Sequence, residues 1–143
     1  MNIAAIIADR DRQAIISCDV ATPVCEAIGI LGKQRIGALP VLQEGRVVGI
    51  ISERDVIYRI SDHGAACLDL AVGEIMTSPA ITIAPENTID EALSLMTRRR
   101  FRHFPVVDSG ELVAFISIGD LVKHKMDEIE HEAAALRNYI QTV

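Results

Sequence analysis

The chain lacks tryptophan and has few aromatic residues, with two tyrosines and three phenylalanines among 143 residues. Its core must therefore be built from aliphatic side chains, and few stacking platforms are left for single-stranded nucleic acid. No apolar run approaches the roughly 18 residues of a membrane-spanning helix, so we expect no membrane association. The apolar stretch at the start is too short for a secretory signal, which predicts a cytoplasmic protein.

Positive charge is also scarce, because 14 lysines and arginines face 20 aspartates and glutamates and give a formal net charge of −6. A protein whose surface grips nucleic acid needs a basic face, so this composition argues against that class. One cationic cluster stands out, at Arg98, Arg99, Arg100, Arg102 and His103. Binding of RNA through this cluster is kept as the weakest of three hypotheses.

Motifs of metal sites and of the common enzyme classes are missing as well. The three cysteines form no C-x-x-C pair, which indicates free thiols in the core, and neither a Walker lysine loop nor a G-x-G-x-x-G motif occurs. His124, Glu128 and His131 share one face of a predicted helix, but three ligands on one helix cannot close a metal shell. We therefore predict no metal site, no catalytic residues and no required cofactor. A small nucleotide-dependent enzyme that uses His103 and a nearby aspartate as an acid–base pair is the alternative.

The chain repeats itself at an offset of 65 residues. Residues 16–58 align without a gap on residues 81–123, with 11 identities in 43 positions. A repeat of this length indicates two copies of one structural unit. Each copy is too small to bury its apolar face alone, so we expect the two to pack together. The predicted divisions are a first motif over 1–62, a connector over 63–79, a second motif over 80–126 and a helical extension over 127–143.

Each copy predicts the order β-α-β-β-α, which gives an α+β fold with pseudo-twofold symmetry and a C-terminal helix. Apolar residues at helical spacing predict a helix after Thr22-Pro23 in the first copy and after Asn87 in the second, with Thr22 and Asn87 as capping residues. Gly45 and Gly110 predict tight hairpin turns. The expected strands are 14–18, 38–42 and 46–52, repeated at 80–84, 103–107 and 111–117, and the expected first helices are 23–34 and 88–99.

A serine and an aspartate three residues later stand where the last strand of each copy runs into a helix. These pairs are Ser52 with Asp55 and Ser117 with Asp120. The simpler interpretation is a capping box, in which each side chain bonds the backbone amide of the other residue. The same geometry also offers a hydroxyl and free amides to a phosphate, and a carboxylate to a ribose. Two copies in register make a binding role the stronger hypothesis.

Three features carry a family resemblance: the β-α-β-β-α repeat, the segments ALPVL…GRVVGIISERD and HFPVV…GELVAFISIGD, and the linker GEIMTSPAIT. Together they resemble a tandem pair of CBS domains, or Bateman module, over about residues 1–126. The resemblance implies a non-catalytic regulatory module in which two clefts between the copies bind adenine ligands such as AMP, ADP, ATP, NAD(H) or S-adenosylmethionine. It also implies that the ligand changes the shape of the module or of a dimer, and so signals to an effector protein that the sequence does not identify.

By this resemblance, each cleft combines the early helix and strand of one copy with the Ser-x-x-Asp pair of the other. One cleft would use Thr22, Ala27, Ile36, Gly37 and Ala38 with Ser117 and Asp120. The second would use Asn87, Ala92, Arg102 and His103 with Ser52 and Asp55. Because Arg102 and His103 suit a phosphate, we expect the second cleft to take the more anionic ligand. Ala114 stands where the first copy has Gly49, and its methyl group is expected to crowd a ligand in the adjacent cleft.

The last helix carries a second pattern. Its apolar residues follow a 4-3-4-3-4 spacing, which is a heptad stripe on an otherwise polar helix. They are Val122, Met126, Ile129, Ala133, Leu136 and Ile140. A stripe of this kind packs either on the chain's own core or on a second subunit. We expect the second arrangement, a homodimer, because the chain resembles CBS pairs, which form discs that commonly dimerise.

Overall fold

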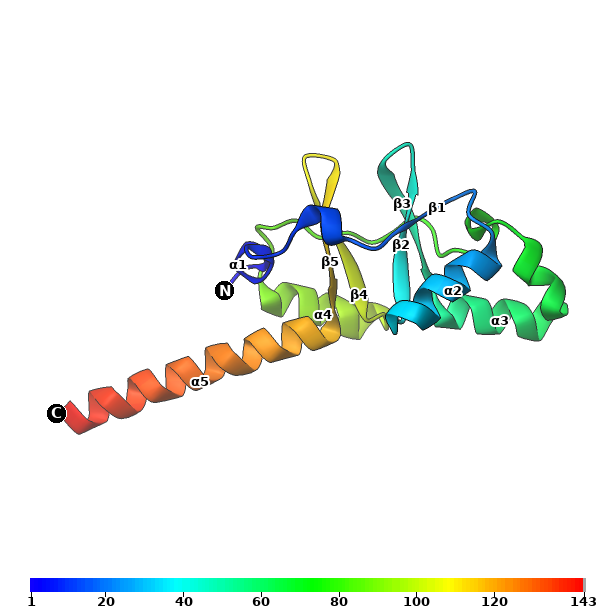
Figure 1. Cartoon of the computed structure of the whole chain (residues 1–143). Helices are drawn as coiled ribbons and strands as arrows, with labels where there is room; N and C mark the ends of the chain where they lie inside the picture. The colour runs from blue at the N-terminus through cyan, green and yellow to red at the C-terminus, as the bar shows by residue number, and fades with distance from the viewer. Residues whose placement is uncertain (143) are drawn as a thin grey trace.

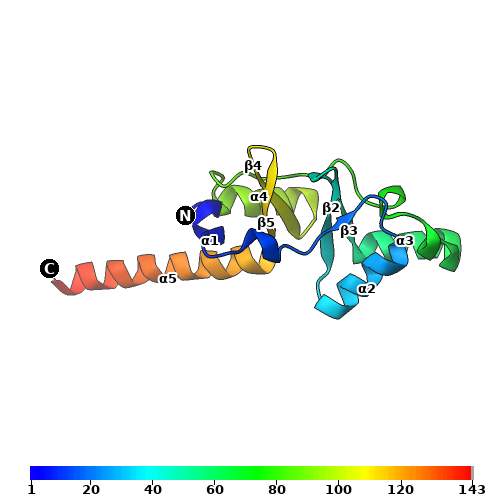
Figure 2. The same cartoon turned by 45° about the horizontal axis from the view of Figure 1, so that its top comes forward.

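The computed structural model describes residues 1–142 and shows two similar halves side by side (Figures 1 and 2). The first half contains β1 (Cys18–Asp19), α2 (Val24–Gln34), β2 (Ala38–Gln43), β3 (Arg46–Ser52) and α3 (Glu53–His63). The second contains α4 (Ile89–Arg99), β4 (His103–Asp108), β5 (Glu111–Ser117) and α5 (Ile118–Thr142). A short helix, α1 (Ile3–Ile7), and three 3₁₀ turns, η1 (Arg12–Ala14), η2 (Gly64–Asp69) and η3 (Val72–Glu74), complete the described elements. The predicted α+β fold is confirmed.

The central hairpins of the two halves have the same construction. β2 pairs antiparallel with β3, and β4 pairs antiparallel with β5. Each turn places two residues at positive φ, Glu44 and Gly45 in one hairpin and Ser109 and Gly110 in the other. Positive φ at both turn positions matches the right-handed twist of paired strands, which explains the glycine in each turn. The predicted hairpins are therefore confirmed.

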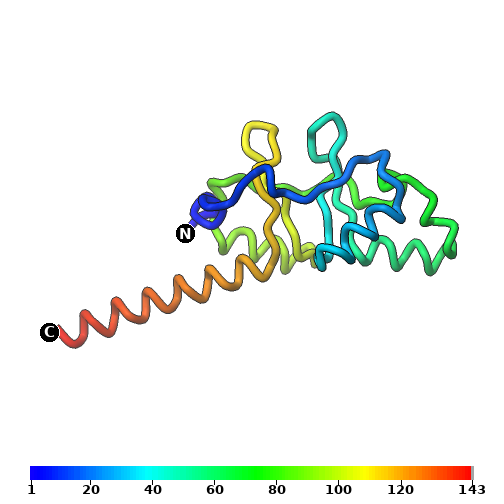
Figure 3. Tube along the Cα trace, in the orientation of Figure 1, coloured from blue at the N-terminus to red at the C-terminus, as the bar shows by residue number. Residues whose placement is uncertain are grey.

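The strands expected at the start of each copy are much shorter than predicted. In the first half only Cys18 and Asp19 pair, parallel to β2. In the second half the equivalent contact is a single parallel bridge between Ile83 and Val106. The strands predicted over 14–18 and 80–84 are therefore too long. Most of each segment crosses between the halves instead of pairing with a strand (Figure 3).

The caps of the first helix in each half also differ from the prediction. α2 has no side-chain cap, and the Thr22 hydroxyl accepts a hydrogen bond from the amide of Asp19 at 3.0 Å. α4 begins after Thr88, which forms a capping box with Glu91. The predicted caps Thr22 and Asn87 are thus wrong. Both side chains instead bond the backbone of the loop that leads into the helix.

Each half has its own core, built mainly of aliphatic side chains. Each core also contains residues of the segment that leads into the other half, and Figure 3 shows the path of these segments. Ile3 and Ile6 of α1 precede the first repeat but are buried in the core of the second half. Val72 and Ile75 precede the second repeat but are buried in the core of the first half. A unit of about 50 residues buries too little surface alone, and this exchange joins the halves. The divisions at residues 62 and 79 stay predictions. Each core contains residues from both sides of at least one of these divisions.

α5 leaves the body of the molecule after its first turns and extends away from it (Figures 1 and 2). Leu121 is fully buried in the core of the second half, whereas every described residue from 129 to 142 is exposed. Ile129, Leu136 and Ile140 of the predicted stripe are 50%, 60% and 64% exposed. The alternative that this helix lies on its own core therefore holds only for its start.

The longest helix, α5, has 25 residues and interleaves charged residues with its apolar stripe. No helix within residues 1–142 is both long enough and apolar enough to cross a membrane. The cytoplasmic location stays a prediction.

Candidate functional site

Two cavities lie where the halves meet, and Ala38, His103 and Ser117 line both of them. We name each cavity after the aspartate of the Ser-x-x-Asp pair that lines it. The Asp55 cavity has a volume of about 670 Å³ and the Asp120 cavity a volume of about 390 Å³. Both volumes fall in the range of small-molecule sites, roughly 300–1,000 Å³.

In the Asp55 cavity, the serine and aspartate form the capping box of α3. The Asp55 amide donates to Ser52 Oγ at 3.3 Å, and the Ser52 amide and hydroxyl donate to Asp55 Oδ2 at 2.8 and 3.0 Å. The second carboxylate oxygen, Oδ1, accepts a hydrogen bond from the Thr77 hydroxyl at 2.9 Å. Within residues 1–142 no cation forms an ion pair with Asp55. The Asp55 cavity is therefore lined by a carboxylate whose charge has no direct partner.

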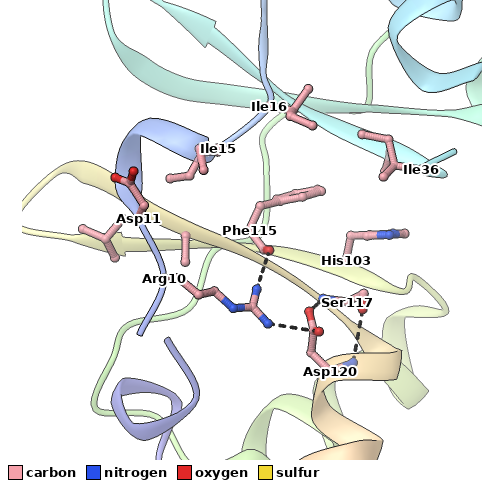
Figure 4. A pocket seen from close by; sticks show the side chains of 13 residues that line it. Arg10, Asp11, Ile15, Ile16, Ile36, His103, Phe115, Ser117 and Asp120 are labelled. Carbon is pink, nitrogen blue, oxygen red and sulfur yellow. Dashed lines mark hydrogen bonds and ion pairs between the residues drawn. The ribbon is translucent and has the colours of Figure 1, made fainter. Parts of the chain in front are cut away.

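In the Asp120 cavity, Ser117 and Asp120 form the equivalent capping box, and Asp120 also contacts a cation, Arg10 (Figure 4). The Ser117 amide donates to Asp120 Oδ2 at 2.9 Å, and the Asp120 amide donates to Ser117 Oγ at 3.2 Å. Arg10 Nη2 lies 3.0 Å from Asp120 Oδ1, and Arg10 Nη1 donates to the carbonyl of Phe115 at 3.2 Å. Burial raises the pKa of Asp120, but hydrogen bonds from Ser117 and Arg10 and the charge of Arg10 outweigh it. The pKa of Asp120 therefore lies below its usual value, and this carboxylate is ionised and paired.

Arginine side chains gather around the Asp55 cavity. Arg54, Arg99, Arg100 and Arg102 all line it. The planar fork of a guanidinium suits a phosphate, which it can bind through two parallel hydrogen bonds. The Asp55 cavity thus combines a carboxylate with several groups that suit an anion.

His103 lies between the two cavities. Its half-buried ring stacks on Phe115, with ring centroids 5.4 Å apart and an interplanar angle of 10°. Burial lowers the pKa of His103 and the charge of Arg102 lowers it further, while Asp120 and Glu53 act in the opposite direction. His103 is therefore neutral near pH 7, so it offers a ligand hydrogen bonds and a ring face, and the positive charge comes from the arginines.

The structure brings together most of the predicted site residues. Ser52, Asp55, Arg102, His103, Gly37, Ala38 and Ser117 line the Asp55 cavity, and Ile36, Ala38, His103, Ser117 and Asp120 line the Asp120 cavity. Gly37 therefore lies on the opposite cavity from the one predicted. Thr22, Ala27, Asn87 and Ala92 line neither cavity. Ala27 and Ala92 are 0% and 1% exposed because each packs its helix against a core, and the other two residues shape the loops ahead of those helices.

Sequence reasoning missed many lining residues, among them Arg10, Thr77 and Tyr58, whose side chains can form hydrogen bonds. The first two lie outside the aligned ranges 16–58 and 81–123, so the repeat gave no reason to consider them. Tyr58 lies on α3 three residues after Asp55, and this spacing places the two side chains on neighbouring parts of one helix face. That spacing was the signal that could have identified it.

Gly49 serves the packing between the connector and β3. A Cβ atom at this position would lie 2.6 Å from Met76 Sδ and 2.8 Å from the carbonyl oxygen of Thr77. The equivalent Ala114 is 1% exposed and packs in the core of the second half, beside the Asp120 cavity. The glycine is thus explained by the close approach of the connector, and crowding of a ligand by Ala114 stays a prediction.

A family model, that of the CBS domain, matches residues 7–62 and 72–127. Among curated proteins the chain is similar to the CBS domain-containing protein CBSX3, mitochondrial, of Arabidopsis thaliana, with 35% identity over 129 residues. The match covers 87% of this chain and 63% of that protein. The chain therefore spans less than two thirds of the length of this relative.

Solved structures share the fold. A CBS-domain containing protein from Agrobacterium tumefaciens matches with a TM-score of 0.81 and 33% identity, over 87% of this chain and 99% of that one. A CBS domain pair solved in complex with 5′-methylthioadenosine and S-adenosyl-L-methionine matches with a TM-score of 0.73 and 25% identity, over 86% and 98% of the two chains. The resemblance predicted from the repeat and its motifs is confirmed: the chain belongs to the CBS domain family and contains two CBS domains in tandem.

Proposed function

We propose that the chain is a regulatory module, without catalytic activity of its own, whose Asp55 cavity binds an adenine nucleotide. One observation carries the proposal. The Asp55 cavity is lined by four arginines and by the carboxylate of Asp55, which forms no ion pair within residues 1–142. A carboxylate accepts the hydroxyls of a ribose, and guanidinium groups bind phosphates. A nucleotide carries both groups.

The remaining wall of the Asp55 cavity suits a base. Ile50, Pro79, Ala80 and Ile81 line it and supply an apolar surface. Both ligands of the solved CBS domain pair, 5′-methylthioadenosine and S-adenosyl-L-methionine, contain adenosine, which supports adenine as the base. The arginines favour a phosphorylated adenosine over these uncharged or cationic ligands. We therefore propose AMP, ADP, ATP or NAD(H) as the ligand.

The proposed signal is a change in how the two halves meet. The Asp55 cavity has walls from both, with Ser52 on β3 and Arg102 just ahead of β4. A ligand that contacts both walls favours the arrangement in which they are closest, and it shifts the equilibrium only by its difference in affinity for the two arrangements. The new arrangement would then be detected by an effector protein.

The proposed module is a homodimer that pairs through α5. Met126, Ile129, Leu136 and Ile140 are all at least half exposed along one stripe of this helix. Charged residues cover its other faces, which is typical of a helix that pairs with another helix. Light scattering of the full chain and of a Leu136→Glu, Ile140→Glu variant tests this: we expect a dimer mass that the variant loses. A monomer mass for the unmodified chain at all concentrations would refute it.

Calorimetric titration with AMP, ATP, NADH and S-adenosylmethionine tests the ligand proposal. We expect Asp55→Ala to weaken binding of the preferred nucleotide by at least about tenfold, since the ribose loses its acceptor. Asp62→Ala is the matched control, because Asp62 lies exposed on the same helix and away from the cavity, and it should bind as the unmodified chain does. Unchanged affinity in Asp55→Ala, or no binding of any of the four compounds, would refute the proposal. Conversion of the bound nucleotide during incubation would revive the enzyme hypothesis.

A further inference from the structure

The two aspartates are approached in the same way by crossing segments. Asp55, in the first repeat, is met at Oδ1 by Thr77 from the segment that leads into the second repeat. Asp120, in the second repeat, is met at Oδ1 by Arg10 from the segment that leads into the first repeat. In both cases Oδ2 is occupied by the amide of the capping serine. Oδ1 is therefore the oxygen left to a ligand in each cavity.

The chemistry at that oxygen differs between the cavities. The Thr77 hydroxyl is neutral, and it can rotate away and leave the charge of Asp55 to a ribose hydroxyl. Arg10 neutralises the charge of Asp120, and its guanidinium is bound at two points, since it also donates to the Phe115 carbonyl. A guanidinium adds the attraction of opposite charges to its hydrogen bond with a carboxylate, and a neutral hydroxyl does not. A ribose hydroxyl at Asp120 must therefore displace a stronger partner than a ribose hydroxyl at Asp55.

The segment that carries Arg10 is held by backbone hydrogen bonds at both ends, and between them it contacts the second half through the side chains of Arg10 and Arg12. On one side α1 is fixed to the second half, where the amides of Ile3 and Ala4 donate to the carbonyls of Asn87 and Pro85 at 2.8 Å each. On the other side β1 pairs with β2. Every residue from 8 to 14 is exposed. Segments with few buried contacts open at low free-energy cost, so this one can withdraw Arg10 without unfolding either half.

We propose that Arg10 is a built-in competitor that occupies the ribose position of the Asp120 cavity, so that the chain binds one nucleotide tightly, at Asp55, and opens the Asp120 cavity only when residues 8–14 move. This inference rests on the proposed nucleotide binding and adds that Arg10 keeps the Asp120 cavity from binding a second nucleotide. It also makes the two cavities unequal although their Ser-x-x-Asp pairs are equivalent. Movement of residues 8–14 is then the structural consequence of filling the second cavity.

Titration of the full chain with AMP, monitored by calorimetry, tests this inference. The variants are Arg10→Ala, Arg10→Gln, Asp55→Ala and the double variant Arg10→Ala, Asp120→Ala. We expect one tight AMP per unmodified chain, lost in Asp55→Ala, and a second AMP in both Arg10 variants, bound at least about tenfold more tightly than in the unmodified chain. The double variant should lose that second AMP. Arg12→Ala is the control, because within residues 1–142 Arg12 forms one ion pair, with Glu111 at 3.8 Å, and lines neither cavity.

The results separate this inference from the function on which it rests. Arg10 variants that still bind a single AMP, through Asp55, would overturn the inference and leave the proposed function standing. A second AMP in the unmodified chain that is weakened in the Arg10 variants would also overturn it, because Arg10 would then be a phosphate ligand. AMP bound by the Arg10 variants but not by the unmodified chain would support the inference and refute the Asp55 site. No AMP on any variant would refute the inference, and the titrations with ATP, NADH and S-adenosylmethionine would then decide the proposed function.

Discussion

One methyl group at Gly49 would test how the connector joins the first half. A Cβ atom there would lie 2.6 Å from Met76 Sδ and 2.8 Å from the carbonyl oxygen of Thr77. The thioether of Met76 can turn aside, but Thr77 is held by two backbone hydrogen bonds with Ile50, at 3.0 and 2.9 Å. We therefore expect Gly49→Ala to push the connector away from β3.

The size of the effect follows from these distances. Carbon atoms in ordinary contact lie about 3.5–4.0 Å apart, so the connector must move by about 1 Å. Overpacking of this kind costs about 1–3 kcal/mol, and weakening of two backbone hydrogen bonds adds up to about 1 kcal/mol each. We expect the free energy of unfolding to fall by about 2–4 kcal/mol. Because Pro79, Ala80 and Ile81 of the same segment line the Asp55 cavity, the same displacement should move this wall of the cavity and weaken AMP binding there.

Urea denaturation of the unmodified chain, Gly49→Ala and Gly29→Ala measures this. Gly29 is the matched control, because it is exposed within α2 and an added Cβ would meet no atom within 4 Å. Alanine is favoured over glycine in a helix by about 0.5–1 kcal/mol, so the control should be more stable than the unmodified chain. Gly49→Ala as stable as the unmodified chain would refute the close approach of the connector, and lost stability with unchanged AMP affinity would refute its link to Asp55.

Three further predictions concern the core, the thiols and acid. Phe104 is fully buried, so Phe104→Ala should lower the free energy of unfolding in urea by about 3–5 kcal/mol, and a loss below about 1 kcal/mol would contradict the described core. A thiol reagent should label only Cys25 quickly, because Cys25 is exposed and Cys67 is buried. Cys18 should react slowly because burial, together with neighbouring acidic residues, raises its pKa to about 11. Fast labelling of the Cys25→Ser variant would disprove this. His103 has a lowered pKa when folded, so the unfolded chain binds its proton first and stability should fall as the pH drops below about 6.5. His103→Gln should flatten that fall in urea melts from pH 7 to 5, whereas the exposed His63→Gln should not.

Much of the fold could be predicted because the residues that determine it lie close together in the chain and occur in both repeats. The hairpins rest on glycines at equivalent turn positions, and the structure gives both turns the same positive φ values to within a few degrees. The Ser-x-x-Asp boxes are also set by residues three apart, so both form as predicted. The early strands failed for the opposite reason. Apolar β-branched residues at 14–18 favour an extended chain, but an extended chain is a strand only where a neighbour pairs with it.

The candidate site could be predicted only in part, because half of it comes from contacts across the chain. Asp55 and Arg102 were predicted from motif and charge, and both line one cavity. Ala27 and Ala92 follow the family pattern, but helical spacing turns both toward the cores. Arg10 carries no local signal, since it precedes the repeat and meets Asp120 only through the crossing of α1 to the second half.

The difference between Gly49 and Ala114 is also related to the segments that cross between the halves. The carbonyls of Ile50 and Phe115 occupy equivalent places, one residue after the glycine and the alanine. Where glycine leaves room, the connector backbone comes close enough for an amide to bond the Ile50 carbonyl at 2.9 Å. Where alanine stands, the Phe115 carbonyl is bonded instead by the long side chain of Arg10, at 3.2 Å. Where glycine stands, a backbone segment and a neutral threonine hydroxyl reach the aspartate. Where alanine stands, a guanidinium reaches it. Two equivalent Ser-x-x-Asp pairs thus differ in electrostatics because of their neighbours.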